Sequence, residues 1–258
     1  MDLGISDRTA FVAASTGGLG LAVARALAAE GVRVAITGRR RDRAERIAAE
    51  LPGAVAVAAD FTCPEGAVSA VDRAEEALGA PVDIAVLNGP GPKPGAAAAM
   101  GADELASAFD LLVRPQHALV TRVLPGMRKR RWGRVLAVGS SGVTAPLPNL
   151  AVSNTGRAAL AGYLKTLAAE VALDAVTVNL LLPGRIATDR VAELDAAAAK
   201  RRGLAVEDVQ LESRKTIPAR RYGTPEEFGA AAAFLCGAPA SYITGVALRC
   251  DGGLIRSL

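Results

Sequence analysis

The chain has 258 residues, of which 51% are hydrophobic, so it can bury one large core. Its net charge of +4 is too small to indicate a nucleic-acid-binding protein. His117 is the only histidine and the three cysteines are widely spaced, which excludes most histidine-based triads, a disulfide framework and a metal site.

Apolar runs of strand length alternate with longer helical patterns along the whole chain. We expect strands at residues 9–14, 32–37, 54–58, 83–88, 134–139, 176–181 and 246–249. We expect helices at residues 18–30, 42–51, 65–78, 102–129, 150–172 and 226–235. Continuous apolar strands joined by helices predict the α/β class, as a Rossmann-type doubly wound parallel sheet of about seven strands flanked by helices on both faces.

The composition does not shift along the chain, so we expect a single domain over residues 1–258. Residues 188–217 are first Ala-rich and then charged, which predicts an insert of one or two helices that covers a ligand. Neither a secretory leader nor an apolar run of about 18 residues stands out in the sequence. We therefore expect a soluble cytoplasmic protein that does not bind a membrane.

A glycine-rich turn joins the first expected strand to the first expected helix. It consists of Ser15, Thr16, Gly17, Gly18, Leu19 and Gly20. Glycines at this position let the backbone approach a pyrophosphate, and the free N–H groups of the helix favour its negative charge. The turn therefore predicts a dinucleotide site, with a purely structural tight turn as the alternative.

Two arginines at the end of the second strand indicate which dinucleotide is bound. An acidic residue there would bind the ribose hydroxyls of NAD and repel a 2′-phosphate. This chain has Arg39 and Arg40 instead, and guanidinium groups pair well with phosphate. We predict NADP(H) as the cofactor, with Arg39 as the main contact; the alternative is that both arginines are ordinary solvated charges.

Several motifs resemble those of the short-chain dehydrogenase/reductase family, and most closely its β-ketoacyl carrier-protein reductase-like branch. The glycine-rich turn is similar to the family pattern Thr-Gly-x-x-x-Gly-x-Gly, although Ala13 and Ala14 replace its first two residues. Further matches are Asp60-Phe61-Thr62, Pro183-Gly184-Arg185-Ile186-Ala187-Thr188, residues 221–227, residues 242–245 and residues 251–253. One motif is distorted: Leu87-Asn88-Gly89-Pro90-Gly91 stands in place of the family's Asn-Asn-Ala-Gly. The resemblance implies cofactor contacts from Asp60, Phe61, Asn88, Gly89, Pro183, Gly184, Ile186 and Thr188.

The family's catalytic residues are mostly replaced in this chain. The resemblance implies a Ser, a Tyr, a Lys and an Asn; Ser140 matches the first, while Ser153 stands at the Tyr position and Arg157 at the Lys position. Leu112 stands at the Asn position. A guanidinium stays protonated and cannot relay a proton. Because general acid–base groups contribute about 10²–10⁴-fold, we expect a loss of that size in ordinary carbonyl reduction.

Ser153 and Arg157 are four residues apart on one expected helix, so they share a face. Together with Ser140 they are the predicted catalytic residues, forming a clamp of two hydroxyls and a guanidinium on one substrate oxygen. The alternative is that Ser153 and Arg157 are substitutions without a function, in a site that has lost its catalytic activity. Tyr163 and His117 are expected to lie off this face, which leaves the proton to solvent or substrate.

Three functions are compatible with this site. The first is an NADP(H)-dependent oxidoreductase acting on a small carbonyl, alcohol or enone. The second is an enzyme of the same fold doing non-redox elimination, isomerisation or cyclisation, and the third is an inactive NADP(H)-binding partner subunit. The resemblance also implies a homodimer or homotetramer formed through the helices expected at residues 102–129 and 150–172.

Overall fold

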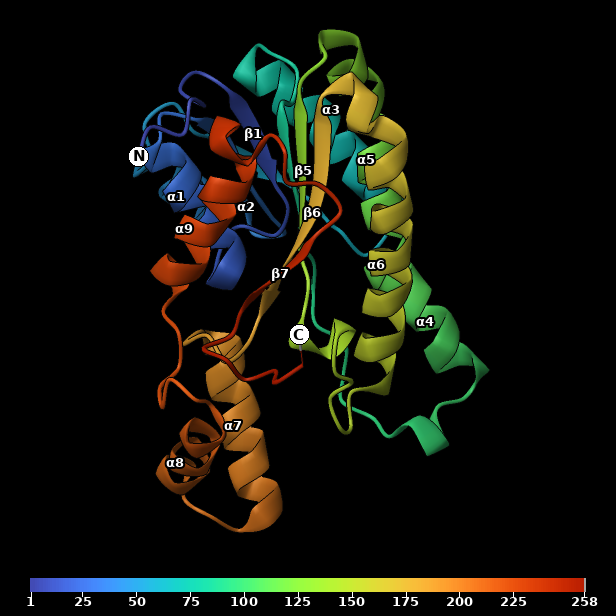
Figure 1. Cartoon of the computed structure of the whole chain (residues 1–258), viewed down its shortest axis with the longest axis vertical. Helices are drawn as coiled ribbons and strands as arrows, with labels where there is room; N and C mark the ends of the chain where they lie inside the picture. Colours follow the sequence, from blue (N-terminus) through green and yellow to red (C-terminus); the bar gives the residue numbers. More distant parts are fainter. Residues whose placement is uncertain (258) are drawn as a thin grey trace.

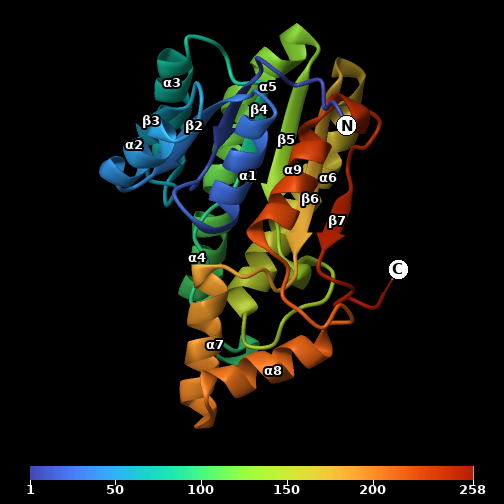
Figure 2. The same ribbon diagram turned by 90° about the vertical axis from the view of Figure 1, so that its left-hand side faces the viewer.

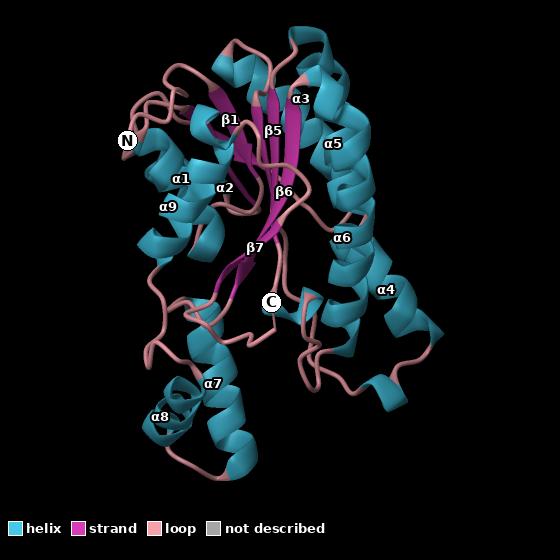
Figure 3. Cartoon of the chain, in the orientation of Figure 1, coloured by secondary structure: helices cyan, strands magenta, loops and turns pink. Residues whose placement is uncertain are grey.

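The computed structural model describes residues 1–257. Its seven strands form one parallel sheet in the order β3-β2-β1-β4-β5-β6-β7. The strands are β1 (Thr9–Val12), β2 (Arg33–Gly38), β3 (Val55–Ala58), β4 (Ile84–Leu87), β5 (Gly133–Val138), β6 (Val176–Pro183) and β7 (Ala247–Cys250). Figure 3 shows this sheet between two layers of helices. The predicted α/β class and doubly wound parallel sheet are therefore confirmed.

The helices cover both faces of the sheet. They are α1 (Gly18–Ala29), α2 (Arg41–Ala49), α3 (Pro64–Leu78), α4 (Ala102–Leu112), α5 (Arg114–Arg130), α6 (Ala151–Val171), α7 (Asp189–Arg202), α8 (Val206–Thr216) and α9 (Pro225–Cys236). Residues of α1, α2 and α9 build one hydrophobic core, and residues of α3, α5 and α6 build the other (Figure 1). Successive residues of β1 point into opposite cores, as the alternation along a strand requires: Phe11 into one and Val12 into the other.

The helix expected over residues 102–129 is in fact two helices. α4 ends at Leu112 and α5 begins at Arg114, with Val113 between them at φ −114° and ψ −59°. Pro115, in the first turn of α5, accounts for the break, because it has no N–H to continue the helical ladder from α4. The prediction of a single helix was wrong, although the proline that causes the break is visible in the sequence.

Two helices occupy the region predicted as an insert. α7 and α8 lie beyond the carboxyl ends of the central strands, and Figure 2 shows the arrowheads of β5, β6 and β7 directed toward that end of the molecule. Thr188 begins α7 by accepting a hydrogen bond from the N–H of Val191 (3.4 Å), and Gly203 ends it in the left-handed conformation. Within residues 1–257 no helix is long and apolar enough to cross a membrane.

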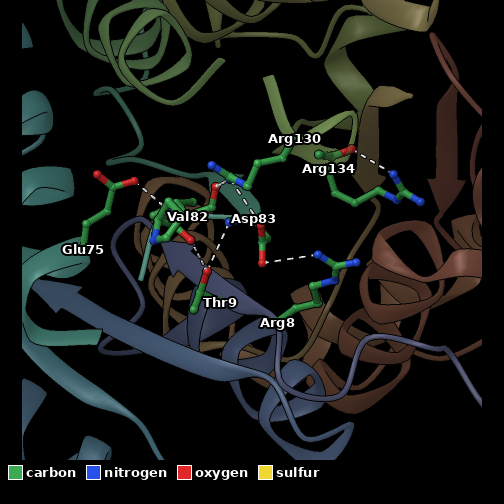
Figure 4. A network of polar contacts seen from close by, with 9 residues as sticks. Arg8, Thr9, Glu75, Val82, Asp83, Arg130 and Arg134 are labelled. Atoms are coloured by element: carbon green, nitrogen blue, oxygen red, sulfur yellow. Dashed lines mark hydrogen bonds and ion pairs between the residues drawn. The ribbon is translucent and has the colours of Figure 1, made fainter. Parts of the chain in front are cut away.

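A network of ionic contacts lies at the opposite, amino end of the strands. Asp83, directly before β4, forms ion pairs with two arginines. Its carboxylate oxygens lie 3.2 Å from Arg130 Nη2 and 3.7 Å from Arg8 Nη1. Figure 4 shows Asp83 between these two arginines. The backbone N–H of Asp83 also donates to Thr9 Oγ1 (3.2 Å), which ties the start of β4 to the start of β1. The contacts thus fix the strand ends far from the region that α7 covers.

Candidate functional site

A cavity of about 790 Å³ runs along the carboxyl ends of the strands, where doubly wound sheets bind their ligands. It is bordered by the loops after β1, β2, β3, β4, β5 and β6, by α6, and by the first turns of α7. The predicted site residues that line it are Thr16, Gly17, Gly18, Leu19, Arg39, Asp60, Phe61, Asn88, Gly89, Ser140, Ser153, Arg157, Pro183, Gly184, Ile186 and Thr188. The fold therefore brings most of the predicted residues into one cavity.

The glycine-rich turn has little room for side chains. A Cβ atom at residue 20 would lie 2.5 Å from the carbonyl oxygen of Ala14 and 2.8 Å from Asn88 Nδ2, so Gly20 permits this close approach without lining the cavity itself. Gly18 has φ +53°, a conformation that side chains disfavour. Ala14 adopts a similar φ of 48° despite its methyl group, so the turn carries local backbone strain.

Ser15 holds this turn from the inside. Its buried side chain donates to the carbonyl oxygen of Val12 (2.8 Å) and accepts from the N–H of Thr37 (2.8 Å). Both contacts are internal to the ends of β1 and β2, and Ser15 does not line the cavity. The structure therefore gives Ser15 a role in shaping the turn.

Two arginines line the cavity beyond β2, but they are not the pair expected from the sequence. Arg39 lines it as expected, whereas Arg40 directly precedes α2 and does not. Arg43, in the first turn of α2, lines the cavity, and its Nη2 lies 3.3 Å from the position of a Cβ at Gly17. The sequence analysis missed Arg43. Arg39 lies before α2, so helical spacing does not relate it to Arg43, and the sequence alone gives little signal for this contact.

Asn88 and Gln116 hold the loop after β4. Asn88 Nδ2 donates to the carbonyl oxygen of Ala14 (3.3 Å), which joins this loop to the glycine-rich turn. Gln116, from α5, donates its Nε2 to the carbonyl oxygen of Asn88 (3.2 Å) and is almost fully buried. Gln116 was also missed, because nothing in the sequence shows that α5 passes beneath this loop.

Ser140, Ser153 and Arg157 meet at the carboxyl end of β5. Ser140 Oγ accepts from the N–H of Gly142 (3.1 Å), and Ser153 Oγ accepts from Arg157 Nε (3.3 Å). Arg157 Nη1 donates to the carbonyl oxygens of Val138 (3.0 Å) and Gly139 (3.1 Å). Burial lowers the pKa of the Arg157 guanidinium from its ordinary value, although a guanidinium remains protonated near neutral pH. The site thus holds a fixed positive charge beside two hydroxyls.

Three residues near α6 do not line the cavity. Leu112 is buried against α6, where a Cβ at Gly156 would lie 2.8 Å from Leu112 Cδ1. The rings of His117 and Tyr163 pack against each other with their centroids 5.2 Å apart, and burial raises the pKa of Tyr163. The geometry therefore agrees with the expectation that His117 and Tyr163 lie away from Ser153 and Arg157.

α7 is tied to the loops on both sides of the cavity. The buried carboxylate of Asp195 accepts from Arg185 Nη1 (2.7 Å) and from the hydroxyl of Tyr222 (2.9 Å). Burial is the main cause that raises the pKa of Tyr222. Arg190 donates to the carbonyl oxygen of Pro92 (3.4 Å), so α7 also contacts the loop after β4. These contacts hold α7 over the end of the cavity that contains Ser153.

A doubly wound parallel sheet with a glycine-rich turn after β1, and a cavity along the strand ends, defines a dinucleotide-binding α/β protein of the Rossmann type. The family model described as enoyl-(acyl carrier protein) reductase matches residues 13–255. With this match and the relatives below, the chain belongs to the short-chain dehydrogenase/reductase family, which confirms the resemblance. Among residues 1–257 there is no cluster of His, Cys, Asp and Glu able to hold a metal ion.

Three relatives illustrate this similarity. The dehydrogenase/reductase SDR family member 4 of Bos taurus is 31% identical, over 98% of this chain and 89% of its own. The NADPH-dependent reductase BacG of Bacillus subtilis is 27% identical, over 98% of this chain and 100% of its own. A crystal structure of L-sorbose reductase from Gluconobacter frateurii, complexed with NADPH and L-sorbose, superimposes with a TM-score of 0.93 at 31% identity, covering 100% of both chains.

Proposed function

We propose that this protein is an NADP(H)-dependent oxidoreductase acting on a small carbonyl, alcohol or enone, with Ser140, Ser153 and Arg157 in place of the family's usual catalytic set. One observation carries the proposal: these three residues line the same cavity as the glycine-rich turn and Arg39. A nucleotide bound along the strand ends and a substrate bound beside Ser140 would therefore share one cavity.

The residues present fit an NADP(H) molecule. The turn at Gly17 and Gly18 offers backbone N–H groups at the start of α1, and Gly20 permits its close packing. Arg39 and Arg43 supply positive charge beyond β2, where a 2′-phosphate is expected. Relatives described as NADPH-dependent or solved with NADPH support the same cofactor. When bound, NADPH supplies a hydride.

The hydrogen-bond directions suit stabilisation of a negatively charged oxygen. The oxygens of Ser140 and Ser153 each accept from an N–H group, so both hydroxyl hydrogens remain free to donate. Donation to these oxygens also polarises the hydroxyls, which strengthens their own donated bonds. Ser140 would orient the substrate oxygen, and Ser153 with Arg157 would stabilise negative charge that develops on it.

The residues that could supply a proton bear on which reaction the site can perform. Among the described residues lining the cavity there is no Tyr, His or Lys, and its carboxylates, Asp60, Asp189 and Glu193, form no hydrogen bond or ion pair with Ser140, Ser153 or Arg157. This supports solvent or the substrate as the proton donor. The same observation favours a second candidate, elimination or isomerisation of an enolate-forming substrate by the clamp. Product formation without added NADP(H) would identify this second candidate.

The test has a binding stage and a turnover stage. Titration calorimetry should show tighter binding of NADPH than of NADH, and a panel of small carbonyls and enones should include substrates that oxidise NADPH. Ser140→Ala should abolish this turnover without weakening NADPH binding, because the hydroxyl acts on the substrate. Tight NADPH binding with no oxidation by any panel member would contradict the proposed redox function.

A homodimer or homotetramer remains part of the proposal. Leu105 and Phe109 lie one turn apart on α4 and are 44% and 41% exposed, so they present an apolar surface near α6. Sedimentation of the purified protein would measure the oligomeric state directly.

A further inference from the structure

Three arginines from different elements line the substrate end of the cavity, and they differ in how their charge is neutralised. Arg185 pairs with the buried carboxylate of Asp195 at 2.7 Å, and Arg190 lies 3.6 Å from Glu193. Arg157 has no such partner, since no carboxylate among residues 1–257 lies within 4.0 Å of its guanidinium. Its contacts are two carbonyl oxygens and one hydroxyl.

A buried charge without a counter-ion is costly, and carbonyl oxygens compensate it only in part. Desolvation alone lowers the pKa of Arg157, with no carboxylate raising it. Arg157 lines the cavity, so a ligand anion can reach it where no side chain does. The contacts to Ser153, Val138 and Gly139 use the hydrogens of Nε and Nη1, which leaves Nη2 to donate a charge-assisted hydrogen bond to a ligand carboxylate.

The phosphates of the dinucleotide are not expected to fill this role. The glycine-rich turn that would hold the pyrophosphate follows β1, whereas Arg157 contacts the end of β5, with β4 between them. Two strand spacings separate the two positions by about 10 Å. Arg39 and Arg43 lie still further toward β2. An anion that pairs with Arg157 would therefore belong to the substrate and not to the dinucleotide.

Apolar side chains also line the cavity: Leu147, Pro148 and Leu150 before α6, and Val191 and Leu194 of α7. The other charged groups of α7 and the loop after β6 include the pairs Arg185–Asp195 and Arg190–Glu193. The cavity thus combines apolar surface with one arginine, Arg157, that lies beside two serine hydroxyls and has no carboxylate partner within residues 1–257.

We propose that the substrate is a small carbonyl compound with an apolar body and a carboxylate close to its carbonyl group, and that this carboxylate binds Arg157 and Ser153 while Ser140 contacts the carbonyl oxygen. The proposal rests on the proposed function. For a 2-oxo acid, the carbonyl carbon gains a hydride from NADPH and the oxygen gains a proton from solvent, giving a 2-hydroxy acid and NADP⁺.

Binding of unreactive probes tests the charge requirement directly. Calorimetric titration of the protein saturated with NADP⁺ would compare 4-methylpentanoate with the neutral 4-methylpentanamide, which has the same carbon skeleton. We expect the carboxylate to bind at least about 10-fold more tightly, the effect of a charge-assisted pair over a neutral one. Equal affinities would overturn the proposal. Because this comparison uses the unaltered protein, misfolding of a variant cannot affect it.

Variants assign the preference to one residue. Arg157→Met should abolish it, whereas Arg157→Lys should retain part of it because the charge remains. Arg190→Met is the matched control, since it removes a cavity arginine that already has Glu193 beside it, and should leave the preference unchanged. A full carboxylate preference in Arg157→Met would overturn the assignment.

A turnover assay separates failure of this proposal from failure of the redox function. NADPH oxidation would be measured with 4-methyl-2-oxopentanoate and with its methyl ester. Equal rates with acid and ester would overturn the carboxylate site and leave the oxidoreductase intact. A strong carboxylate preference in binding, with no NADPH oxidation by any oxo acid, would overturn the redox function and leave the carboxylate site.

Discussion

The two ends of the sheet use arginine in opposite ways. At the amino end, Asp83 lies against Arg130 and Arg8 with only 12% of its side chain exposed. Arg134 has no carboxylate there, but its guanidinium lies over the Trp132 ring at 4.5 Å and donates to backbone carbonyls. The charges at this end are therefore compensated within the protein, by ion pairs, an aromatic ring or backbone carbonyls.

At the carboxyl end, Arg157 has neither a carboxylate nor, within residues 1–257, an aromatic ring over its guanidinium. Arg39 and Arg43 also line the cavity without a carboxylate partner in that part of the chain. Arg134 is also without a carboxylate and its Nε has no hydrogen-bond partner, but the Trp132 ring covers its guanidinium. The difference teaches that the groups facing a guanidinium, carboxylates or an aromatic ring, distinguish stabilising arginines from ligand-binding ones better than burial does.

The largest effect on stability is expected at the amino end. Asp83→Asn leaves Arg8 and Arg130 without their carboxylate, and because both arginines are about a third exposed we expect the free energy of unfolding to fall by about 2 kcal/mol. Urea denaturation measures this value, and NADPH affinity serves as the control that should not change. A loss of cofactor affinity would show that the two ends are not independent.

Arg157→Met should give the reverse pattern. Turnover should fall by about 100-fold, because the substrate loses the charge that positions it beside Ser140. The free energy of unfolding should change by less than about 1 kcal/mol, because the loss of two bonds to carbonyls is offset by removal of an unpaired buried charge. If urea denaturation finds a loss as large as that of Asp83→Asn, Arg157 is a structural residue and the comparison fails.

A smaller effect is expected where the cofactor phosphate would bind. Arg39→Gln and Arg43→Gln should each weaken NADPH binding by about 10-fold and leave NADH binding nearly unchanged. Arg40→Gln is the matched control, since Arg40 is adjacent in sequence but does not line the cavity. Fluorescence titration at two salt concentrations would measure all three, and equal losses in Arg40→Gln would argue for a diffuse charge effect.

The smallest effect concerns two alanines with left-handed backbone, one at each end of the sheet. Ala14 has φ 48° and Ala175, directly before β6, has φ 57°. Replacing either by glycine relieves strain and should raise the free energy of unfolding by about 0.5–1 kcal/mol. Only Ala14→Gly should also change NADPH affinity, toward tighter binding, because Ala14 lines the cavity. Thermal unfolding with and without NADPH distinguishes the two variants.

Local patterns in the sequence were sufficient to predict the sheet, its alternating helices and the glycine-rich turn. Pro115 indicates a break near Val113, but the apolar periodicity continues on both sides of this position and predicted one helix. The contacts of Gln116 and Arg43 depend on how α5 and α2 lie against loops from other strands. Such contacts arise only when distant segments meet, so a single sequence carries little signal for them.

The pairing of charges was equally hidden. Arg185 and Arg157 look alike in sequence as arginines near the expected substrate region. Asp195 neutralises Arg185 from ten positions along the chain, in a helix whose orientation the sequence does not fix, whereas no carboxylate among residues 1–257 approaches Arg157. The clamp of Ser140, Ser153 and Arg157 was predicted from the family's catalytic positions. That Arg157 has no carboxylate partner, which makes it a ligand-binding charge, is visible only in the structure.

The contacts of Asp195 have a consequence for how ligands enter and leave. Its fully buried carboxylate joins α7 to Arg185, in the loop after β6, and to Tyr222, in the loop before α9. An outward movement of α7 alone would separate this carboxylate from both partners, at a cost of several kcal/mol. We therefore expect α7 and these two loops to move together as one rigid unit, with the hinge outside the contacts of Asp195, Arg185 and Tyr222.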